Sequence, residues 1–315
     1  MAKYRNDLPQ LSGEVFLTDG GIETTLIFHE GLELPHFAAF HLLKDQKGKA
    51  ALQKYFRTYA ALARNYNVGF ILESPTWRAN PDWLMKLDYA DGAVAEINRQ
   101  SIALLQDLRR EFETEKTPIV ISGCVGPRGD GYVPTAAMSA AEAQHYHQQQ
   151  IGAFSVAGAD MVAAITMNYV EEAIGITRAA KSSGLPVAIS FTVETDGNLP
   201  TGQPLKDAIA QVDKSTANAP VYYMINCAHP THFESTLASG EPWVERIRGL
   251  RTNASAKSHA ELNESVELDP GQPEELGRQH RRLLSKMKNL NVFGGCCGTD
   301  HRHVEEICKS ILHKN

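Results

Sequence analysis

The sequence has few of the features of secreted, membrane or nucleic-acid-binding proteins. Five cysteines in 315 residues, with no apolar leader after Met-Ala-Lys-Tyr-Arg-Asn-Asp, argue against a secreted disulfide scaffold. No apolar run approaches the roughly 20 residues that cross a membrane. A net charge of −6, from 37 acidic and 31 basic residues, gives no basic footprint for nucleic acid or anionic lipid. We therefore expect a cytoplasmic protein with reduced thiols and neither nucleic-acid nor membrane partners, and the oligomeric state is unspecified.

Short apolar segments alternate with longer amphipathic ones along the chain. Each apolar segment resembles a buried strand and is followed by a glycine-rich or polar turn and a stretch with helical spacing. The expected strands are Val15–Thr18, Gly69–Leu72, Ile119–Ser122, Asp160–Ala164, Val187–Phe191, Tyr222–Asn226, Gly249–Thr252 and Val292–Gly294. Helices are expected at Lys47–Tyr66, Tyr89–Phe112, from about Ser139, from about Val170, at Leu205–Val212, in two short segments between Thr231 and Ile247, at Pro273–Asn289 and at Arg302–Leu312.

Eight strand–helix units in a chain of this length predict an α/β fold, the (β/α)8 TIM barrel. We expect residues 1–315 to form one such domain, because no linker or low-complexity tract divides the chain. A doubly wound open sheet is the competing arrangement. The even spacing of the units favours the barrel, and so do the chemically reactive residues that directly follow strands, where barrel active sites lie.

Two adjacent cysteines, Cys296 and Cys297, lie in a glycine-rich turn after the eighth expected strand, and Cys227 follows the sixth. In a closed barrel one strand separates the sixth from the eighth, so the three thiols can converge at the C-terminal mouth. Three thiolates suit Zn²⁺, and three protein ligands leave a tetrahedral position open, as in catalytic zinc sites. Such a site favours holding a substrate thiol as a nucleophilic thiolate. Cys124 and Cys308 are expected to be packing residues.

The motifs Gly294-Gly295-Cys296-Cys297-Gly298-Thr299 and Asn226-Cys227 resemble the two zinc-binding motifs of the homocysteine S-methyltransferase family. The resemblance covers nearly the whole chain. It implies transfer of a methyl group from a small sulfonium or ammonium donor, such as S-methylmethionine, to the zinc-bound thiolate of homocysteine, which gives methionine. The implied cofactor is Zn²⁺, and the implied partners are two small molecules, the thiol acceptor and the methyl donor.

The resemblance also indicates residues for the substrate. Thr18-Asp19-Gly20-Gly21 is similar to the family's opening motif, in which the Asp, with a Glu at the end of strand 4, is expected to hold the substrate's amino group. In this chain the Glu position is Ile165. An apolar side chain does not pair with an ammonium group, and an ammonium left unpaired in a closed pocket is costly.

Glu73, after the second expected strand, is the candidate for the missing carboxylate. We predict that Asp19 and Glu73 are the catalytic residues and together receive the substrate amine, with Gly20 and Gly21 beside them. A simple ion pair with Arg78 is the alternative for Glu73. Thr76 fits the family's segment after strand 2, and Asn253 loosely matches its loop after strand 7, so both are predicted to bind substrate.

Three other functions are compatible with these residues. The same zinc barrel would act on a thiol without an amine if Ile165 marks a change of acceptor. A zinc hydrolase would place water in the open position, but three thiolates make a poorer Lewis acid for water than histidine or carboxylate ligands do. A redox-sensing barrel would instead cycle Cys296 and Cys297 through oxidation.

Overall fold

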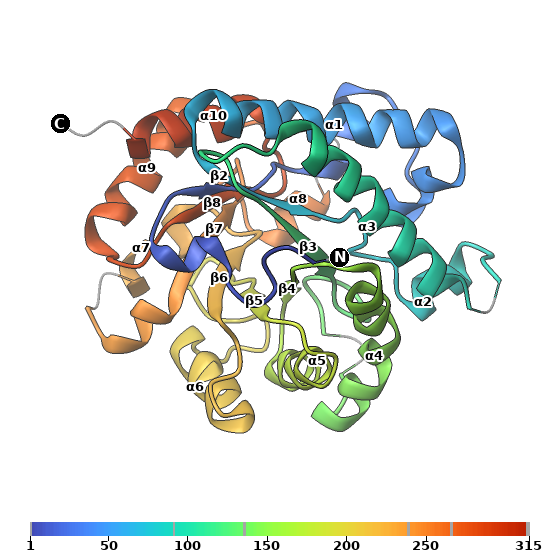
Figure 1. Cartoon of the computed structure of the whole chain (residues 1–315). Helices are drawn as coiled ribbons and strands as arrows, with labels where there is room; N and C mark the ends of the chain where they lie inside the picture. Colours follow the sequence, from blue (N-terminus) through green and yellow to red (C-terminus); the bar gives the residue numbers. More distant parts are fainter. Residues whose placement is uncertain (1, 91, 135–136, 238–239, 265–266, 313–315) are drawn as a thin grey trace.

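Eight parallel strands close into a barrel whose order follows the sequence, with β1 paired to both β2 and β8. Helices surround the strands (Figure 1). The computed structural model describes residues 2–90, 92–134, 137–237, 240–264 and 267–312. The strands are β1 (Phe16–Leu17), β2 (Gly69–Glu73), β3 (Ile119–Val125), β4 (Met161–Met167), β5 (Val187–Phe191), β6 (Tyr222–Asn226), β7 (Ile247–Thr252) and β8 (Val292–Gly295). The closed order confirms the predicted (β/α)8 barrel over the open sheet.

The helices follow the predicted units, with additions in the connections. The α-helices are α1 (Gln46–Tyr66), α2 (Pro81–Lys86), α3 (Ala93–Phe112), α4 (Ala140–Ala157), α5 (Val170–Ser182), α6 (Leu205–Thr216), α7 (Pro230–Leu237), α8 (His259–Glu264), α9 (Pro273–Lys286) and α10 (His301–Leu312). Shorter helical segments are η1 (Pro9–Ser12), η2 (Thr24–His29), η3 (Pro35–Phe37), η4 (Ala39–Lys44) and η5 (Pro242–Arg246). The helix expected from Tyr89 begins only at Ala93, because Gly92 before it has a left-handed φ of 86°.

The N-terminal segment is tied to one end of the barrel by Asp160, which directly precedes β4. Its carboxylate accepts hydrogen bonds from the backbone N–H groups of Lys3 and Tyr4 and from the guanidinium of Arg109 at 2.7 Å. Leu8 packs in the apolar cluster inside the barrel. This end is therefore filled, and the loops at the other end are left to form a site.

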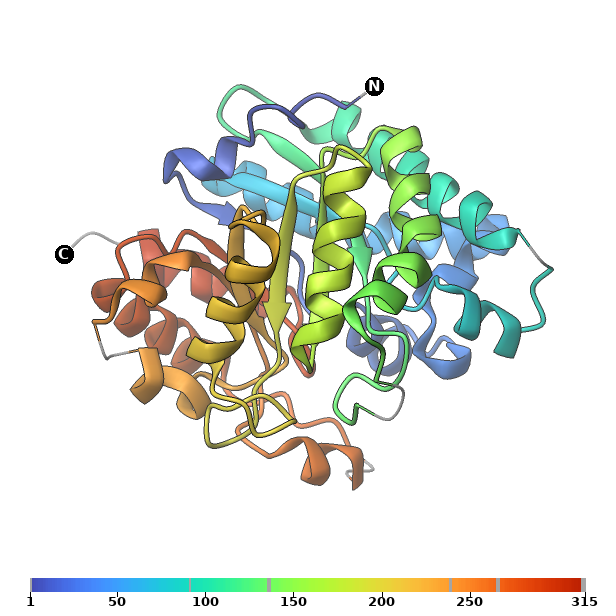
Figure 2. The same ribbon diagram turned by 90° about the horizontal axis from the view of Figure 1, so that it is seen from below.

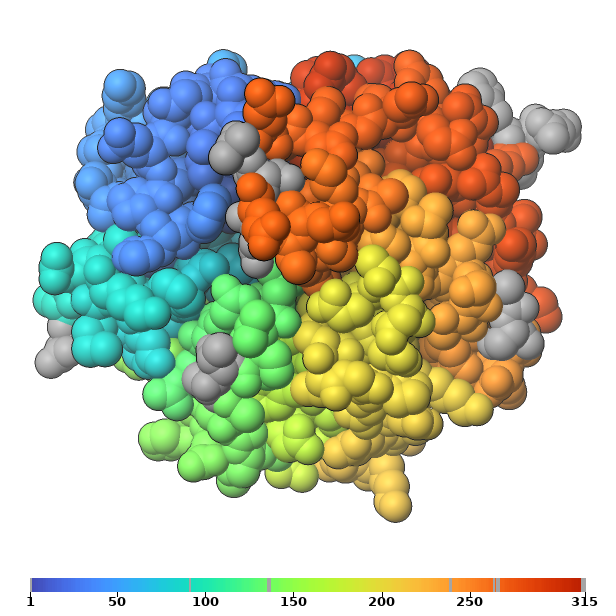
Figure 3. Space-filling model, turned by 180° about the vertical axis from the view of Figure 1, so that it is seen from behind, coloured from blue at the N-terminus to red at the C-terminus, as the bar shows by residue number. Residues whose placement is uncertain are grey.

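The opposite end of the barrel is the C-terminal mouth. In Figure 2 the strand arrows point away from the end at which the N-terminus lies. Figure 3 shows the face behind Figure 1, where N-terminal segments (blue) meet segments from the middle of the chain (green and yellow) and from its last third (orange). No described helix is long and apolar enough to cross a membrane.

Candidate active site

The three predicted metal ligands meet at the C-terminal mouth. Cys227 follows β6, and Cys296 and Cys297 follow β8, with β7 between the two strands. Their sulfur atoms all lie within 4.8 Å of one another, and the Sγ atoms of Cys227 and Cys297 are 4.0 Å apart. Cys227 and Cys296 are joined as a disulfide in this structure. The convergence predicted from the barrel order is therefore present.

The cluster fits a three-cysteine zinc site once its disulfide is reduced. A tetrahedral site with Zn–S bonds of about 2.3 Å needs sulfur atoms about 3.8 Å apart, close to the observed separation of Cys227 and Cys297. Cys297 is exposed while Cys227 is buried, so the cluster opens on one side. That open side faces a cavity and leaves room for a fourth ligand.

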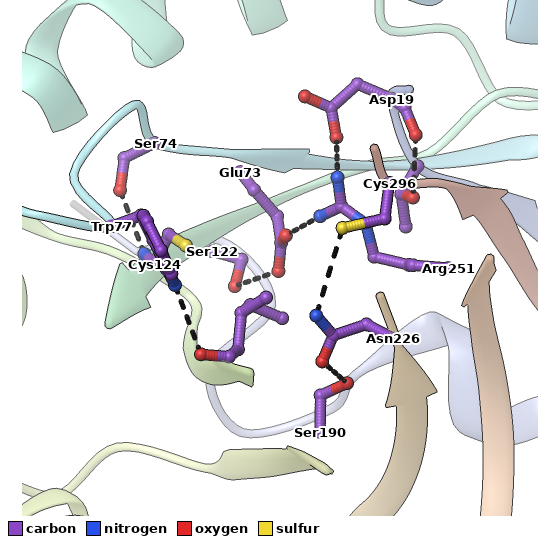
Figure 4. Close-up of polar contacts among 12 residues, drawn as sticks. Asp19, Glu73, Ser74, Trp77, Ser122, Cys124, Ser190, Asn226, Arg251 and Cys296 are labelled. Atoms are coloured by element: carbon purple, nitrogen blue, oxygen red, sulfur yellow. Dashed lines mark hydrogen bonds and ion pairs between the residues drawn. The ribbon is translucent and has the colours of Figure 1, made fainter. Parts of the chain in front are cut away.

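Polar groups surround each sulfur atom. The Tyr132 hydroxyl lies 3.4 Å from Cys297 Sγ, and the Thr166 hydroxyl lies 3.9 Å from Cys227 Sγ. Asn226 Nδ2 donates to Cys296 Sγ at 3.9 Å (Figure 4). Hydrogen bonds to the charged form of an acid favour that form, so these donors would stabilise thiolates.

Asn253 links the two loops that carry the cysteines. Its Nδ2 donates to the carbonyl oxygen of Cys227 at 3.0 Å, and its Oδ1 accepts from the backbone N–H of Cys297 at 3.1 Å. Cys227 itself has a left-handed φ of 54°, which is uncommon for a residue other than glycine. Asn253 thus positions the cysteines from outside the cavity wall.

A bulge at the end of β4 brings Ile165 and Thr166 to the site. The pairing register with β5 shifts between Ala164 and Met167, and Thr166 has a φ of 65°, which is strained for a β-branched residue. Asn226 holds this conformation, because its Oδ1 accepts from the Thr166 N–H at 2.9 Å and its Nδ2 donates to the Thr166 hydroxyl at 2.8 Å. The side chain of Ile165 lines the cavity where the family resemblance places a Glu.

Gly20 and Gly21 bring the segment after β1 against the cysteine turn. A Cβ atom on Gly20 would lie 2.6 Å from the Tyr59 hydroxyl, and one on Gly21 would lie 2.6 Å from the carbonyl oxygen of Cys296. The Gly21 N–H donates to the carbonyl oxygen of Thr299 at 3.1 Å. Both glycines line the cavity, and their lack of a side chain permits this close approach. Substrate contact by the two glycines stays a prediction.

Arg251, near the end of β7, lies between the two predicted carboxylates. Its Nη2 donates to Asp19 Oδ1 at 2.5 Å, and its Nη1 donates to Glu73 Oε2 (Figure 4). Its Nε donates to the carbonyl oxygen of Gly295 at 3.3 Å. Asp19 and Glu73 therefore lie in one site, as the sequence predicted. Their shared partner is an arginine of the chain itself.

Burial controls the electrostatics of this ion network. Removal from water raises the pKa of Glu73 to about 7, although Arg251 acts in the opposite direction. Burial also raises the pKa of Asp19, against the effects of Arg251 and the Tyr55 hydroxyl. Burial lowers the pKa of Arg251, but the two carboxylates outweigh it and raise that pKa overall. Arg251 thus remains a cation beside two acids that resist ionisation.

Two other sequence predictions concern residues that lie outside the cavity lining. Thr76 is fully buried, and its hydroxyl donates to the carbonyl oxygen of Cys124 at 2.7 Å. Asn253 is likewise absent from the lining. Substrate contact by these two residues stays a prediction. Cys124 itself is buried and lines the cavity, whereas Cys308 packs in the outer core.

Arg78, the alternative partner of Glu73, is engaged elsewhere. Its guanidinium lies over the rings of Trp77 and Trp83, at 4.7 and 3.7 Å from their centroids. Trp77 lines the cavity, and its Nε1 donates to the carbonyl oxygen of Ile165 at 3.2 Å. The predicted alternative, an ion pair between Glu73 and Arg78, is therefore replaced by the pair with Arg251.

Sequence reasoning missed three residues at the mouth: Arg251, Glu23 and Tyr132. Arg251 had a detectable signal, because it lies one residue before the carboxyl end of β7, and the carboxyl ends of the strands form barrel active sites. Glu23 follows the Gly-Gly pair by two residues and lines the cavity. Nothing local marked Tyr132, since its loop approaches Cys297 only in the folded barrel.

The cavity between these residues is small. It has a volume of about 120 Å³ and is bounded by the three cysteines, the carboxylates Asp19, Glu23 and Glu73, Arg251, Trp77, Tyr132 and Ile165, among others. Pockets for drug-sized ligands are larger, roughly 300–1,000 Å³. The space suits a small molecule placed against the cysteines.

Comparison with known proteins gives one consistent result. The model of the homocysteine S-methyltransferase family matches residues 16–311. Betaine–homocysteine S-methyltransferase 1 of Rattus norvegicus is 25% identical over 325 residues, which cover 95% of this chain and 73% of that protein. Homocysteine S-methyltransferase YbgG of Bacillus subtilis is 26% identical over 228 residues, covering 66% of this chain and 68% of the relative.

Solved structures agree on the fold. The homocysteine methyltransferase MmuM from Escherichia coli, in its oxidized form, superposes with a TM-score of 0.77 at 17% identity, covering 97% of this chain and 98% of that one. The metallated form of MmuM gives a TM-score of 0.73, also at 17% identity, with coverage of 95% and 97%. At this identity the likeness establishes the shared barrel.

Proposed function

The chain belongs to the homocysteine S-methyltransferase family and is a methyltransferase, and on that basis we propose that it transfers a methyl group from a small sulfonium or ammonium donor to the sulfur of homocysteine. The observation that carries this proposal is the cluster of three cysteine sulfurs on the wall of a small cavity at the barrel mouth. We further propose that residues 1–315 act as one catalytic domain.

Cys227, Cys296 and Cys297 would hold Zn²⁺. When bound, the metal supplies a Lewis acid that keeps the acceptor sulfur deprotonated near neutral pH. Tyr132, Asn226 and Thr166 would support the cysteines as thiolates through the hydrogen-bond donors described above. All three ligands must be reduced for this, so we place the reaction in a reducing compartment, the cytoplasm.

Asp19 and Glu73 would act through Arg251. To receive a substrate amine directly, they would have to release the guanidinium that both contact. Arg251 has five N–H groups, and three of them donate to Asp19, Glu73 and Gly295. We infer that the others receive the carboxylate of the acceptor, because Arg251 is the cation on the described cavity wall. Asp19 and Glu73 are then positioning residues that orient Arg251.

The donor would be a small diffusible cation. The cavity is lined by three carboxylates and one guanidinium, so its formal charge is negative and it favours a positive ligand. Trp77 and Tyr132 also line it, and aromatic rings attract sulfonium and quaternary ammonium groups. S-Methylmethionine and betaine both meet this description, and we favour S-methylmethionine as the donor.

The test combines thiol binding with product formation. Reduced, zinc-loaded protein is titrated calorimetrically with homocysteine, 2-mercaptoethanol and 3-mercaptopropionate, and methionine is then measured by mass spectrometry after incubation with homocysteine and each donor. We expect homocysteine to bind most tightly and methionine to form with S-methylmethionine. Methionine absent with every donor would contradict the proposal.

One second candidate is favoured by a specific observation. Ile165 is apolar at the position of the family's expected Glu, which would suit a thiol without an amine. That candidate predicts equal or tighter binding of 3-mercaptopropionate than of homocysteine in the same titration.

A further inference from the structure

Glu23 is a cavity carboxylate that the proposed reaction leaves without a role. It is the N-cap residue of η2, is half-buried, and lines the cavity with Asp19 and Glu73. Those two share Arg251 as their ion-pair partner. Among the described residues, no ion pair or side-chain hydrogen bond is made by Glu23, whose carboxylate interacts with its own backbone N–H.

The backbone on both sides of Glu23 is fixed to the cysteine turn. On one side the Gly21 N–H donates to the carbonyl oxygen of Thr299 at 3.1 Å, and on the other the Thr24 hydroxyl accepts from the Gly298 N–H at 3.0 Å. This turn also carries Cys296 and Cys297. Glu23 is therefore held at a defined place near the sulfurs.

We propose that Glu23 binds the α-ammonium group of the acceptor, and so supplies the carboxylate that Ile165 cannot provide. The inference rests on the proposed function, because it requires a thiol amino acid in the cavity. In homocysteine the ammonium nitrogen is four bonds from the sulfur. The Glu23 carboxylate acts electrostatically on the thiol of Cys297, so it lies near the sulfurs against which the acceptor would be held. With Arg251 at the acceptor carboxylate, the two residues would recognise both charges of a zwitterion.

The charges around Glu23 agree with this assignment. Asp19 repels it, while Arg78 and Arg251 attract it from a distance without forming an ion pair with it. Partial burial, together with Asp19, raises the pKa of Glu23 to about 7. An acid with a raised pKa gains more from a cationic partner than one that water already solvates. A bound ammonium would restore the ionised form.

The test compares two thiols that differ only in the amine. L-Homocysteine and 4-mercaptobutyrate are titrated calorimetrically into reduced, zinc-loaded wild type, Glu23→Gln and Glu23→Asp. The control variant is Glu33→Gln, which removes one negative charge from an exposed residue outside the cavity lining. A thermal melt of each variant checks folding.

We expect wild type to prefer homocysteine over 4-mercaptobutyrate. Glu23→Gln should weaken homocysteine binding roughly tenfold or more, since a hydrogen bond to a charged group is lost, while 4-mercaptobutyrate binding stays within about twofold. The homocysteine affinity of Glu23→Asp should lie between those of wild type and Glu23→Gln, and that of Glu33→Gln should equal that of wild type. If the role of Glu23 were purely structural, Glu23→Gln would weaken the binding of both thiols equally.

Three outcomes would overturn the inference. Equal binding of the two thiols to wild type would show that the amine is not recognised. An unchanged homocysteine affinity in Glu23→Gln would remove Glu23 from the acceptor site. If wild type bound neither thiol, the proposed function itself would fail, which separates its failure from that of Glu23 alone.

Discussion

At the scale of single residues, Arg251 is the structural centre of the barrel mouth. It forms ion pairs with two buried acids, so removing it would leave both carboxylates without their cation. We predict that Arg251→Met destabilises the protein by about 3–5 kcal/mol. Arg99→Met, which breaks an exposed pair with Glu96, should cost only about 0–1 kcal/mol. Urea denaturation compares the two variants, and equal losses would refute a key role for the Arg251 network.

The raised pKa of Glu23 has a consequence for stability against pH. The folded-state pKa of about 7 lies above the usual value of 4.5, so folding favours the protonated acid. This contribution to stability is fully present below pH 4.5 and is lost as the pH rises through 7. We therefore predict that Glu23→Gln stabilises the ligand-free protein more at pH 8 than at pH 5. Thermal melts of wild type and Glu23→Gln at the two pH values measure this difference. A gain in stability that is larger at pH 5 than at pH 8 would contradict the prediction.

The sequence identified some residues of the site better than others. The three cysteines and Asp19 could be singled out because each lies within two residues of the carboxyl end of a strand, and parallel strands bring such positions to one face. The partner of Glu73 was not found. Arg251 and Arg78 are both near strand ends, and only the side-chain directions in the folded barrel choose between them. The ammonium site proposed at Glu23 also depends on this choice, since Arg251 already takes the other two carboxylates.

At the scale of elements, the bulge in β4 depends on one amide. Asn226, at the end of β6, forms hydrogen bonds with the backbone N–H and the hydroxyl of Thr166. It also accepts a hydrogen bond from the Ser190 hydroxyl at 2.6 Å. We predict that Asn226→Ala lowers zinc affinity about 10- to 100-fold, as loss of a group supporting metal ligands does. A competitive zinc titration measures this. Asn289→Ala, which loses one surface hydrogen bond to the Glu245 carbonyl, is the control, and similar affinities in both variants would contradict the prediction.

The loop after β1 makes a second test at this scale. Gly21→Ala would place a Cβ atom 2.6 Å from the Cys296 carbonyl oxygen, so we expect the loop to move away from the cysteine turn and zinc affinity to fall. Gly152, in α4, has open space around its Cα, and Gly152→Ala should leave zinc affinity unchanged while adding about 0.5–1 kcal/mol of stability. Zinc titration and thermal melts of both variants decide this. Wild-type zinc affinity in Gly21→Ala would show that the close approach is dispensable.

Strand and helix positions were predictable where the apolar pattern was strong. Strands β5 and β6 have the expected bounds. Strand β4 runs to Met167 and includes a bulge that no residue pattern predicted. The short helical segments between β1 and α1 were also missed. They lack a long apolar period, and their conformation is set by packing over the barrel.

At the scale of the whole molecule, the fold was predictable because eight units of one kind allow few closed arrangements. Barrel closure then assembles the candidate site by placing β6 and β8 on either side of β7, so that residues 69 positions apart in the sequence meet. The distribution of charge inside the mouth was not predictable in the same way, because it depends on which side chains turn inward. The proposed recognition of the acceptor's charged groups depends on these same side-chain directions.

The most direct test of the account is metal removal and restoration under reducing conditions. Methionine formation from homocysteine and S-methylmethionine is measured for the reduced protein as loaded with zinc, after chelation, and after one equivalent of zinc is returned. We predict that activity is lost on chelation and recovers with zinc in wild type, and that Cys297→Ser does not recover at the same zinc concentration. Full activity in the metal-free, reduced protein would contradict the three-cysteine zinc site as the centre of the reaction.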